Sequence, residues 1–304
     1  MLWIFQFSFA ATSSTIVSGS LAERTQLPAY LAFSTFMTGF IFPVVVGWSW
    51  GGGWLSDVEG SGGKGFHDFA GTGIVHMVGG VAGFIGAIVI GPRHGKEKNK
   101  KDRKNVLELQ ETRAWIASQN CPQEVEWWVN ELQQDENFDY NSFPFVVFGT
   151  FMLFVCWLFF NASSSLTMFS KEANCSKIMM NTIIAGSSGG LVSAFLKPLI
   201  MGTYSKSHRY DVMALTNGLI SGLVSITGVC DRCEPWSAFF IGLIASIVYS
   251  LACKLWEKFG VDDPVEASQI HGACGMWGLM AVGLFDNKKG LLSDSADSGS
   301  YLGW

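Results

Sequence analysis

The stretch "DFAGTGIVHM" runs from Asp68 to Met77, and the stretch "DPVEASQIHG" runs from Asp263 to Gly272. In each, an aspartate precedes a histidine by eight residues, and a glycine-rich apolar segment follows. An ionisable side chain in an apolar segment is costly unless it has a partner or faces a cavity. The repeated pair therefore favours two related halves that place one functional site between them.

The composition is typical of a membrane protein. Of 304 residues, 49% are hydrophobic and 15% are charged, whereas an average soluble domain carries about 25% charged residues. Eight apolar runs are long enough, at roughly 20 residues each, to cross a bilayer as helices. We therefore expect an all-α polytopic membrane protein with a single transmembrane domain over 1–304 and helices near 2–20, 28–47, 71–90, 143–167, 178–200, 212–230, 236–255 and 265–285.

Lysine and arginine residues favour one orientation of these helices. If the segment after the first run is cytoplasmic, the inner side receives the basic cluster "RHGKEKNKKDRK" (93–104), which opens a loop over 92–142. An excess of basic residues inside is what the positive-inside rule requires. The N-terminal run has no signal-peptide pattern. Both features fit a multi-pass protein of the plasma membrane with 92–142 as a cytoplasmic loop.

Two histidines are expected to meet near the middle of the bilayer. At a rise of about 1.5 Å per residue, His76 lies roughly 10 Å below the outer end of its helix. His271 lies a similar distance above the inner end of its own helix. A lone buried histidine is most often bonded to a backbone carbonyl, but two at matched depth indicate a site. In a dry interior both rings are expected to be neutral, each with one donor and one acceptor.

Small residues follow both histidines at helical spacing. They are Gly79, Gly83 and Gly86 in the first half and Gly272, Gly275 and Gly278 in the second. Such faces let helix backbones approach closely. Because the two halves enter the membrane from opposite sides, the pattern favours inverted repeats with the site at their interface.

Neither a metal nor a cofactor is expected. Cys230 and Cys233 form a CxxC at an expected outer turn, where an external disulfide and a metal pair are both conceivable. A metal site would need a second ligand pair, which the sequence lacks. The net charge of −5 gives no sign of a nucleic-acid partner.

Six stretches together resemble successive signatures of the Amt/Rh ammonium transporter family, nearer its Amt branch. They are "FQFSFAATSSTIVSGSLAER", "WSWGGGW", "DFAGTGIVHMVGGVAGFIGAIVIGPR", "WLFFNASSS", "LTNGLISGLVSITGVC" and "DDPVEASQIHGACGMWGLMAVGLF". Their order and spacing agree over nearly the whole chain except 92–142 and the last twenty residues. The resemblance implies an eleven-helix fold of two inverted five-helix repeats, a trimer, and one narrow pore per subunit for ammonium or ammonia.

The resemblance also implies roles for single residues. It places Phe9 and Phe160 at a stacked phenyl gate, Trp50 and Ser164 at an outer ammonium site, His76 and His271 as twin pore histidines, Trp157 at the pore wall, Asp68 as an acid near the mouth and Glu266 as an acid of the final motif. Cation–π attraction at Trp50 and Phe9 would offset part of the desolvation of an entering cation. Methylammonium is a possible second substrate.

Several of these residues also have a purely structural interpretation beside the functional one. Asp68 directly precedes a helix and could act mainly as an N-cap, at a typical gain of ~1 kcal/mol. Trp50 could be an interfacial belt tryptophan, while Phe9 and Phe160 could be ordinary packing residues. A hydrolase that uses Ser164 is disfavoured because the sequence has no nucleophile-elbow motif, so the chain is not expected to be an enzyme.

Relative to the family pattern, the chain lacks the first two helices and ends after the tenth. We therefore expect a partial sequence or a truncated isoform. A conducting homotrimer, a hetero-oligomer with related subunits, and a non-conducting regulatory or sensor subunit are the open alternatives.

Overall fold

The computed structural model describes residues 2–56, 65–93, 96, 140–167, 174–203 and 210–293. Within these ranges every regular element is a helix. Five helical segments are long and apolar enough to cross a membrane, namely Leu27–Trp48, Thr72–Ile90, Phe143–Ser163, Cys175–Met201 and Pro235–Phe259. The all-α class expected from the sequence is confirmed. The loop predicted over 92–142 lies almost wholly outside the described residues.

The first half of the chain forms helices up to Ile90. In order they are α1 (Leu2–Ser20), α2 (Leu27–Phe36), the π-helix η1 (Met37–Ile41), α3 (Phe42–Trp48), the π-helix η2 (Thr72–Met77) and α4 (Val78–Ile90). Pro28 stands in the first turn of α2, where its missing N–H is not needed. The run predicted over 28–47 thus contains a π-helical turn at its centre.

Among its described residues, the second half forms five α-helices and a further π-helix. They are α7 (Phe143–Ser163), α8 (Cys175–Met201), α9 (Val212–Ile226), α10 (Pro235–Phe259), η4 (Ser268–Ala273) and α11 (Cys274–Phe285). The helix α9 ends four residues before the predicted end at 230. The carbonyls of Thr227 and Gly228 there accept hydrogen bonds from Ala70 and Phe69 at 3.1 and 3.0 Å. These two carbonyls therefore bond to the first half of the chain instead of continuing the hydrogen bonds of α9.

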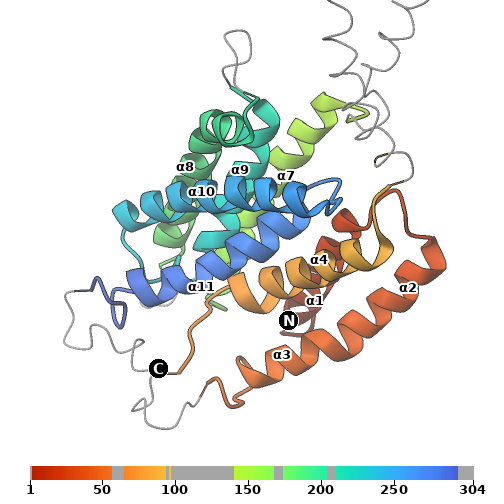
Figure 1. Cartoon of the computed structure of the whole chain (residues 1–304). Helices are drawn as coiled ribbons and strands as arrows, with labels where there is room; N and C mark the ends of the chain where they lie inside the picture. Colours follow the sequence, from red (N-terminus) through yellow and green to blue (C-terminus); the bar gives the residue numbers. More distant parts are fainter. Residues whose placement is uncertain are drawn as a thin grey trace, which may run out of the picture.

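The helices gather into two groups that meet along α4 and α11 (Figure 1). In one group α8 packs against both α9 and α10, and in the other α1 packs against α4. Between the groups, η2 contacts α11 and η4 contacts α4. The two π-helical turns, which carry the two histidines, thus lie at the junction of the halves.

Glycines bring the two halves into backbone contact. A Cβ built on Gly80 would lie 2.1 Å from the backbone nitrogen of Gly272, and one on Gly278 would lie 2.2 Å from Oγ1 of Thr72. Residue numbers rise in one segment as they fall in the other, so the segments cross antiparallel. By contrast, Gly83 faces Ser20 of α1. The two glycine sets predicted from sequence therefore face different neighbours.

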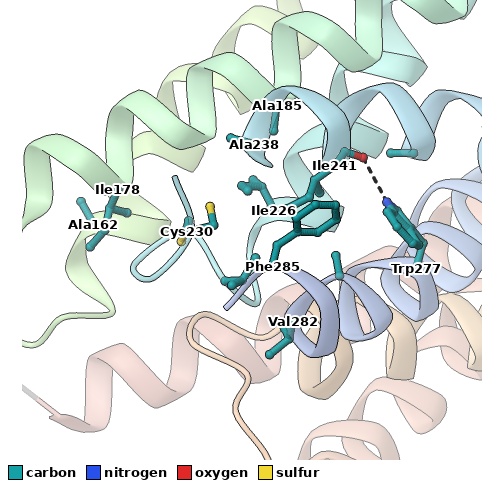
Figure 2. Close-up of a cluster of buried hydrophobic side chains, with 14 residues drawn as sticks. Ala162, Ile178, Ala185, Ile226, Cys230, Ala238, Ile241, Trp277, Val282 and Phe285 are labelled. Atoms are coloured by element: carbon teal, nitrogen blue, oxygen red, sulfur yellow. Dashed lines mark hydrogen bonds between the residues drawn. The ribbon is translucent and has the colours of Figure 1, made fainter. Parts of the chain in front are cut away.

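A buried apolar cluster supports the second half (Figure 2). It joins α8, α9, α10 and α11, and the indole Nε1 of Trp277 donates to the carbonyl of Ile241 at 3.0 Å. Cys230 and Cys233 belong to this cluster as free, fully buried thiols. The thiol of Cys230 donates to the carbonyl of Thr227 at 3.8 Å, and the sulfur of Cys233 accepts Nδ2 of Asn181 at 3.5 Å.

Charged residues that follow α1, α4 and α10 tie the two halves together. The buried carboxylate of Asp262 accepts hydrogen bonds from the backbone and side chain of Arg93 at 2.8 and 3.0 Å, and from Lys96. The side chain of Arg24 donates to the carbonyl of Asp262 at 2.8 Å. Although burial opposes it, these donors hold the pKa of Asp262 well below its usual range. Three cations of the first half thus meet one anion of the second.

Candidate functional site

A buried aspartate caps the π-helix that carries His76. The carboxylate of Asp68 accepts four backbone N–H groups, from Gly71, Thr72, Gly73 and Ile74, at 2.8–3.0 Å. Burial raises the pKa of Asp68, and the four amides oppose that shift because they favour the ionised form. Each carboxylate oxygen is committed to two amides, so this acid fixes the start of the helix.

A second aspartate caps the π-helix that carries His271. Asp263 accepts the backbone N–H groups of Ala267 and Ser268 at 3.1 and 2.7 Å. It also accepts the hydroxyls of Ser268 and of Ser20, at 2.6 and 3.0 Å. The spacing of aspartate and histidine seen in the sequence is therefore the spacing of a cap and the last turn of a π-helix.

One residue in each half adopts a left-handed conformation five residues before the histidine. In the first half it is Gly71, with φ of 96°. In the second half it is Glu266, with φ of 58°. This conformation carries little penalty for glycine and is strained for a residue with a Cβ. The two halves thus share a backbone path, with a side chain added in the second.

The two imidazole rings lie face to face in the interior. Their centroids are 5.2 Å apart with an interplanar angle of 21°. The indole of Trp157 lies nearly parallel to both rings, with centroids 4.8 Å from His76 and 6.5 Å from His271. A hydrogen bond of 3.0 Å from Nε1 of Trp157 to Oγ1 of Thr227 fixes that indole. These three nearly parallel rings, from η2, α7 and η4, form an offset stack whose centroids lie at the corners of a triangle.

The imidazole nitrogens of this stack lack protein partners. Within the described part of the chain, Nδ1 and Nε2 of His76 and Nδ1 of His271 are buried and make no hydrogen bond to protein. Buried polar atoms are almost always satisfied. These three nitrogens therefore remain available to a small polar molecule that passes the rings.

Aromatic rings of α1 and α7 connect the histidine pair to Trp50. The rings of Phe9 and Phe160 have centroids 4.6 Å apart and are tilted by 45°, so they are close but not parallel. Phe160 lies 5.8 Å from His76, and Phe9 meets Trp50 edge to face at 5.4 Å. The order along this series is thus Trp50, Phe9, Phe160 and the histidine pair.

Hydrogen bonds position the polar atoms of the outer residues. Nε1 of Trp50 donates to the backbone carbonyl of Asp68 at 2.8 Å, which orients the indole over the loop before η2. The hydroxyl of Ser164 donates to the carbonyl of Phe160 at 3.0 Å. Its oxygen lone pairs are then available to accept a donor. Ser164 therefore sits one turn beyond the phenylalanine that contacts both Phe9 and His76.

Glu266 lies away from the aromatic series, in a polar network that the sequence did not predict. Its carboxylate binds Nζ of Lys197 at 2.6 and 2.8 Å and accepts Nδ2 of Asn217 at 2.8 Å. The hydroxyl of Tyr249 also donates to it. One signal was visible in the sequence, namely a lysine inside the apolar run 178–200.

The described residues contain no group of three or more His, Cys, Asp or Glu side chains that could hold a metal ion. The residues of the aromatic series and its outer neighbour offer aromatic faces, a hydroxyl and two imidazoles.

A sequence model of the Ammonium Transporter Family matches residues 1–110 and 127–302. The chain belongs to the ammonium transporter family. The match covers most of the chain, and it includes all nine residues predicted for the site. Members of this family are transporters rather than enzymes, and the apolar helices of this member make it a multi-pass membrane protein.

Its known relatives include plant and archaeal proteins. Ammonium transporter 1 member 1 of Solanum lycopersicum is 36% identical over 298 residues, which are 94% of this chain and 53% of the relative. Ammonium transporter Amt2 of Archaeoglobus fulgidus is 36% identical and is matched over 95% of this chain and 54% of its own length. The chain thus spans about half the length of these relatives.

Two solved structures share the family fold. A protein described as "Sensor Amt Protein" has a TM-score of 0.69 and 28% identity, and the match covers 93% of this chain and 60% of that one. Candida albicans Mep2 has a TM-score of 0.70 at 23% identity, over 96% of this chain and 57% of Mep2. The ammonium-transporter fold expected from the sequence is confirmed.

Proposed function

We propose that this family member moves ammonium nitrogen across the membrane along the line of Trp50, Phe9, Phe160 and the histidine pair. The observation that carries the proposal is the stack of His76, His271 and Trp157, whose buried imidazole nitrogens lack protein partners. Apolar faces with a few unsatisfied polar atoms suit a small molecule that needs a hydrogen bond at mid-membrane.

Capture occurs at the outer end. An ammonium ion above the indole of Trp50 and the ring of Phe9 gains cation–π attraction, about 0.5–2 kcal/mol. The hydroxyl oxygen of Ser164 accepts one of its hydrogens. The outer site therefore selects a small cation over neutral solutes of the same size.

Passage beyond the phenylalanines requires loss of the charge. Phe9 and Phe160 lie 4.6 Å apart and present only apolar atoms to the ion, so a bare cation there would have no polar compensation. We propose that ammonium gives up a proton to solvent water at the outer side and that ammonia continues inward. Each imidazole then offers one donor and one acceptor to it.

We place the working protein in the plasma membrane, as a homotrimer or a hetero-oligomer with related subunits. The basic cluster 93–104, which the positive-inside rule places on the inner side, and the family membership support this placement. Large apolar side chains are exposed along the outer faces of α2 and α7, among them Leu31, Phe36 and Phe148. Such faces need lipid or a neighbouring subunit against them.

Uptake of labelled methylammonium tests the capture step. In cells without their own ammonium transporters, we expect saturable uptake by the chain, and Trp50→Leu should raise the half-saturating concentration roughly 2- to 30-fold, the range given by lost cation–π attraction. The matched control is Trp54→Leu, because Trp54 is 65% exposed and lies outside the aromatic series. Equal effects of both replacements would contradict the proposed capture site.

A sensor is the second candidate function. One structural relative, at 28% identity, is described as a sensor. A sensor would keep the outer site and bind ammonium without carrying it. Binding of methylammonium to the purified chain, together with no uptake by cells that display it, would favour this alternative.

A further inference from the structure

The ammonium group of Lys197 is enclosed within the span of α8. Its Nζ lies 2.6 and 2.8 Å from the two carboxylate oxygens of Glu266 and 2.8 Å from the hydroxyl of Tyr249. It also lies 4.9 Å from the centroid of the Tyr249 ring. A lysine ammonium has three donors, and three oxygen atoms surround this one. The surroundings therefore form a complete cage for a primary ammonium ion.

The cage is built from separate elements. Glu266 precedes η4, Tyr249 belongs to α10, and Asn217 of α9 donates to the same carboxylate at 2.8 Å. We call Glu266, Tyr249 and Asn217 the carboxylate cage. Lys197 enters the cage from α8 and contributes only its side chain. The cage residues thus hold one another without the lysine, through the bonds of Asn217 and Tyr249 to Glu266.

The carboxylate cage adjoins the inner side of the histidine pair. The carbonyl of Glu266 accepts the N–H of Ile270, the residue before His271, at 3.0 Å. Tyr249 and Ile270 share one buried cluster with Trp157. The side chain of Glu266 keeps 20% exposure and that of Lys197 keeps 11%, so solvent reaches the cage. Burial and the charge of Glu266 raise the pKa of Tyr140, before α7, to about 12.

The left-handed backbone conformation of Glu266 indicates that its side chain is needed at this position. The equivalent position in the first half is Gly71, which adopts the same left-handed conformation without strain. A non-glycine residue with positive φ is retained where the surroundings fix it, often at a functional site. The second half thus differs from the first by a strained residue that supplies the carboxylate of the cage.

We propose that the carboxylate cage is an ammonium-type cation site at the inner end of the route and that Lys197 is its tethered occupant. This inference rests on the proposed function for its location on a route, but the binding chemistry stands on the cage alone. A tethered group competes at an effective concentration in the millimolar range or above. Lys197 therefore prevents a free ammonium ion from lodging beside the histidine pair.

The competing explanation is an ion pair that serves only packing. Breaking a buried pair is destabilising in either case, because it leaves one charge uncompensated. The two explanations differ in whether the emptied position can be filled again. A cage with room for a primary ammonium can be refilled from solution, whereas a packing contact that collapses cannot.

Chemical rescue of Lys197→Ala tests the proposal. The purified variant in detergent should melt below the parent chain, and propylammonium chloride should raise its melting temperature by roughly 2–4 °C relative to potassium chloride at equal ionic strength. Methylammonium should give a smaller rise, and propanol none. The parent chain should show no rise from propylammonium beyond that of the outer site, because Lys197 fills the cage.

The double variant Lys197→Ala with Glu266→Gly is the matched control. Glycine suits the left-handed backbone, so this variant removes the carboxylate without backbone strain. It keeps the outer site of Trp50 and Ser164, and any rise that it shows with propylammonium measures that site. An equal rise in single and double variants would overturn the proposal, as would a folded single variant with no rise.

If the Lys197→Ala variant folds too poorly for a melting curve, the amount of folded protein recovered is measured instead. Its recovery as a monodisperse species should increase when membranes are solubilised in propylammonium chloride, and unchanged recovery would overturn the proposal. Neither measurement depends on transport. Failure of rescue in a chain that takes up methylammonium would reject the cage alone, and rescue in a chain without uptake would reject only the proposed function.

Discussion

Gly80→Ala is expected to prevent the two halves of the chain from closing against each other. The added methyl carbon would lie 2.1 Å from the backbone nitrogen of Gly272 and 2.5 Å from its Cα. Backbone atoms cannot rotate away as a side chain can, so α4 and η4 must separate. Overpacking of a tight core costs about 1–3 kcal/mol, and we expect the upper end or more, since Gly272 directly follows His271.

Melting of purified protein in detergent measures this effect, with Gly283→Ala as the control. Gly283 also lies within a helix, α11, but a Cβ there meets nothing within 4 Å. That replacement should be neutral or stabilising by up to about 1 kcal/mol, because alanine favours helix over glycine. Equal melting temperatures of the Gly80→Ala and Gly283→Ala variants would contradict the close antiparallel contact at Gly80.

Asp68→Asn is expected to destabilise the chain although the two side chains have the same shape. The amide oxygen of asparagine can accept two of the four backbone N–H groups, while its NH2 group faces the other two. Hydrogen bonds to a charged acceptor contribute about 1.5–3 kcal/mol each, so we expect a loss of roughly 3–5 kcal/mol in the free energy of unfolding. The start of η2, and with it His76, should loosen first.

The control for this loss is Asp211→Asn. Asp211 caps α9 through one oxygen that accepts the N–H groups of Met213 and Ala214, and it is partly exposed. Asparagine is an equally good N-cap there, and the expected change is below about 1 kcal/mol. Equal losses in the two variants would show that Asp68 is an ordinary cap.

The sequence predicts the helices because their length and hydrophobicity are local properties. A run of about 20 apolar residues is long enough to cross a bilayer as an α-helix. The repeated aspartate and histidine predict a site between two halves. The family membership was predicted from ordered motifs, and the family match confirms it. Asp68 had two equal interpretations, and its four amide contacts favour the structural one.

Other features could not be read from the chain. The π-helical turns at Thr72–Met77 and Ser268–Ala273 leave no mark in the hydrophobic pattern, because a shift of one residue per turn is lost within so short a segment. The partners of Glu266 were also missed. Lys197 and Asn217 lie 69 and 49 residues away in the sequence, and only the packing of α8 on α9 and of α9 on η4 brings them together.

The most direct test of the proposed route is transport by the purified chain in sealed vesicles, with and without the histidine pair. Uptake of labelled methylammonium would be measured at an acidic external pH, where almost all of it is protonated and crosses lipid slowly. We predict uptake above that of empty vesicles, and a large loss in the His76→Leu, His271→Leu double variant at equal protein content and melting temperature. Uptake by the double variant equal to that of the parent chain would contradict a route that passes along these two rings.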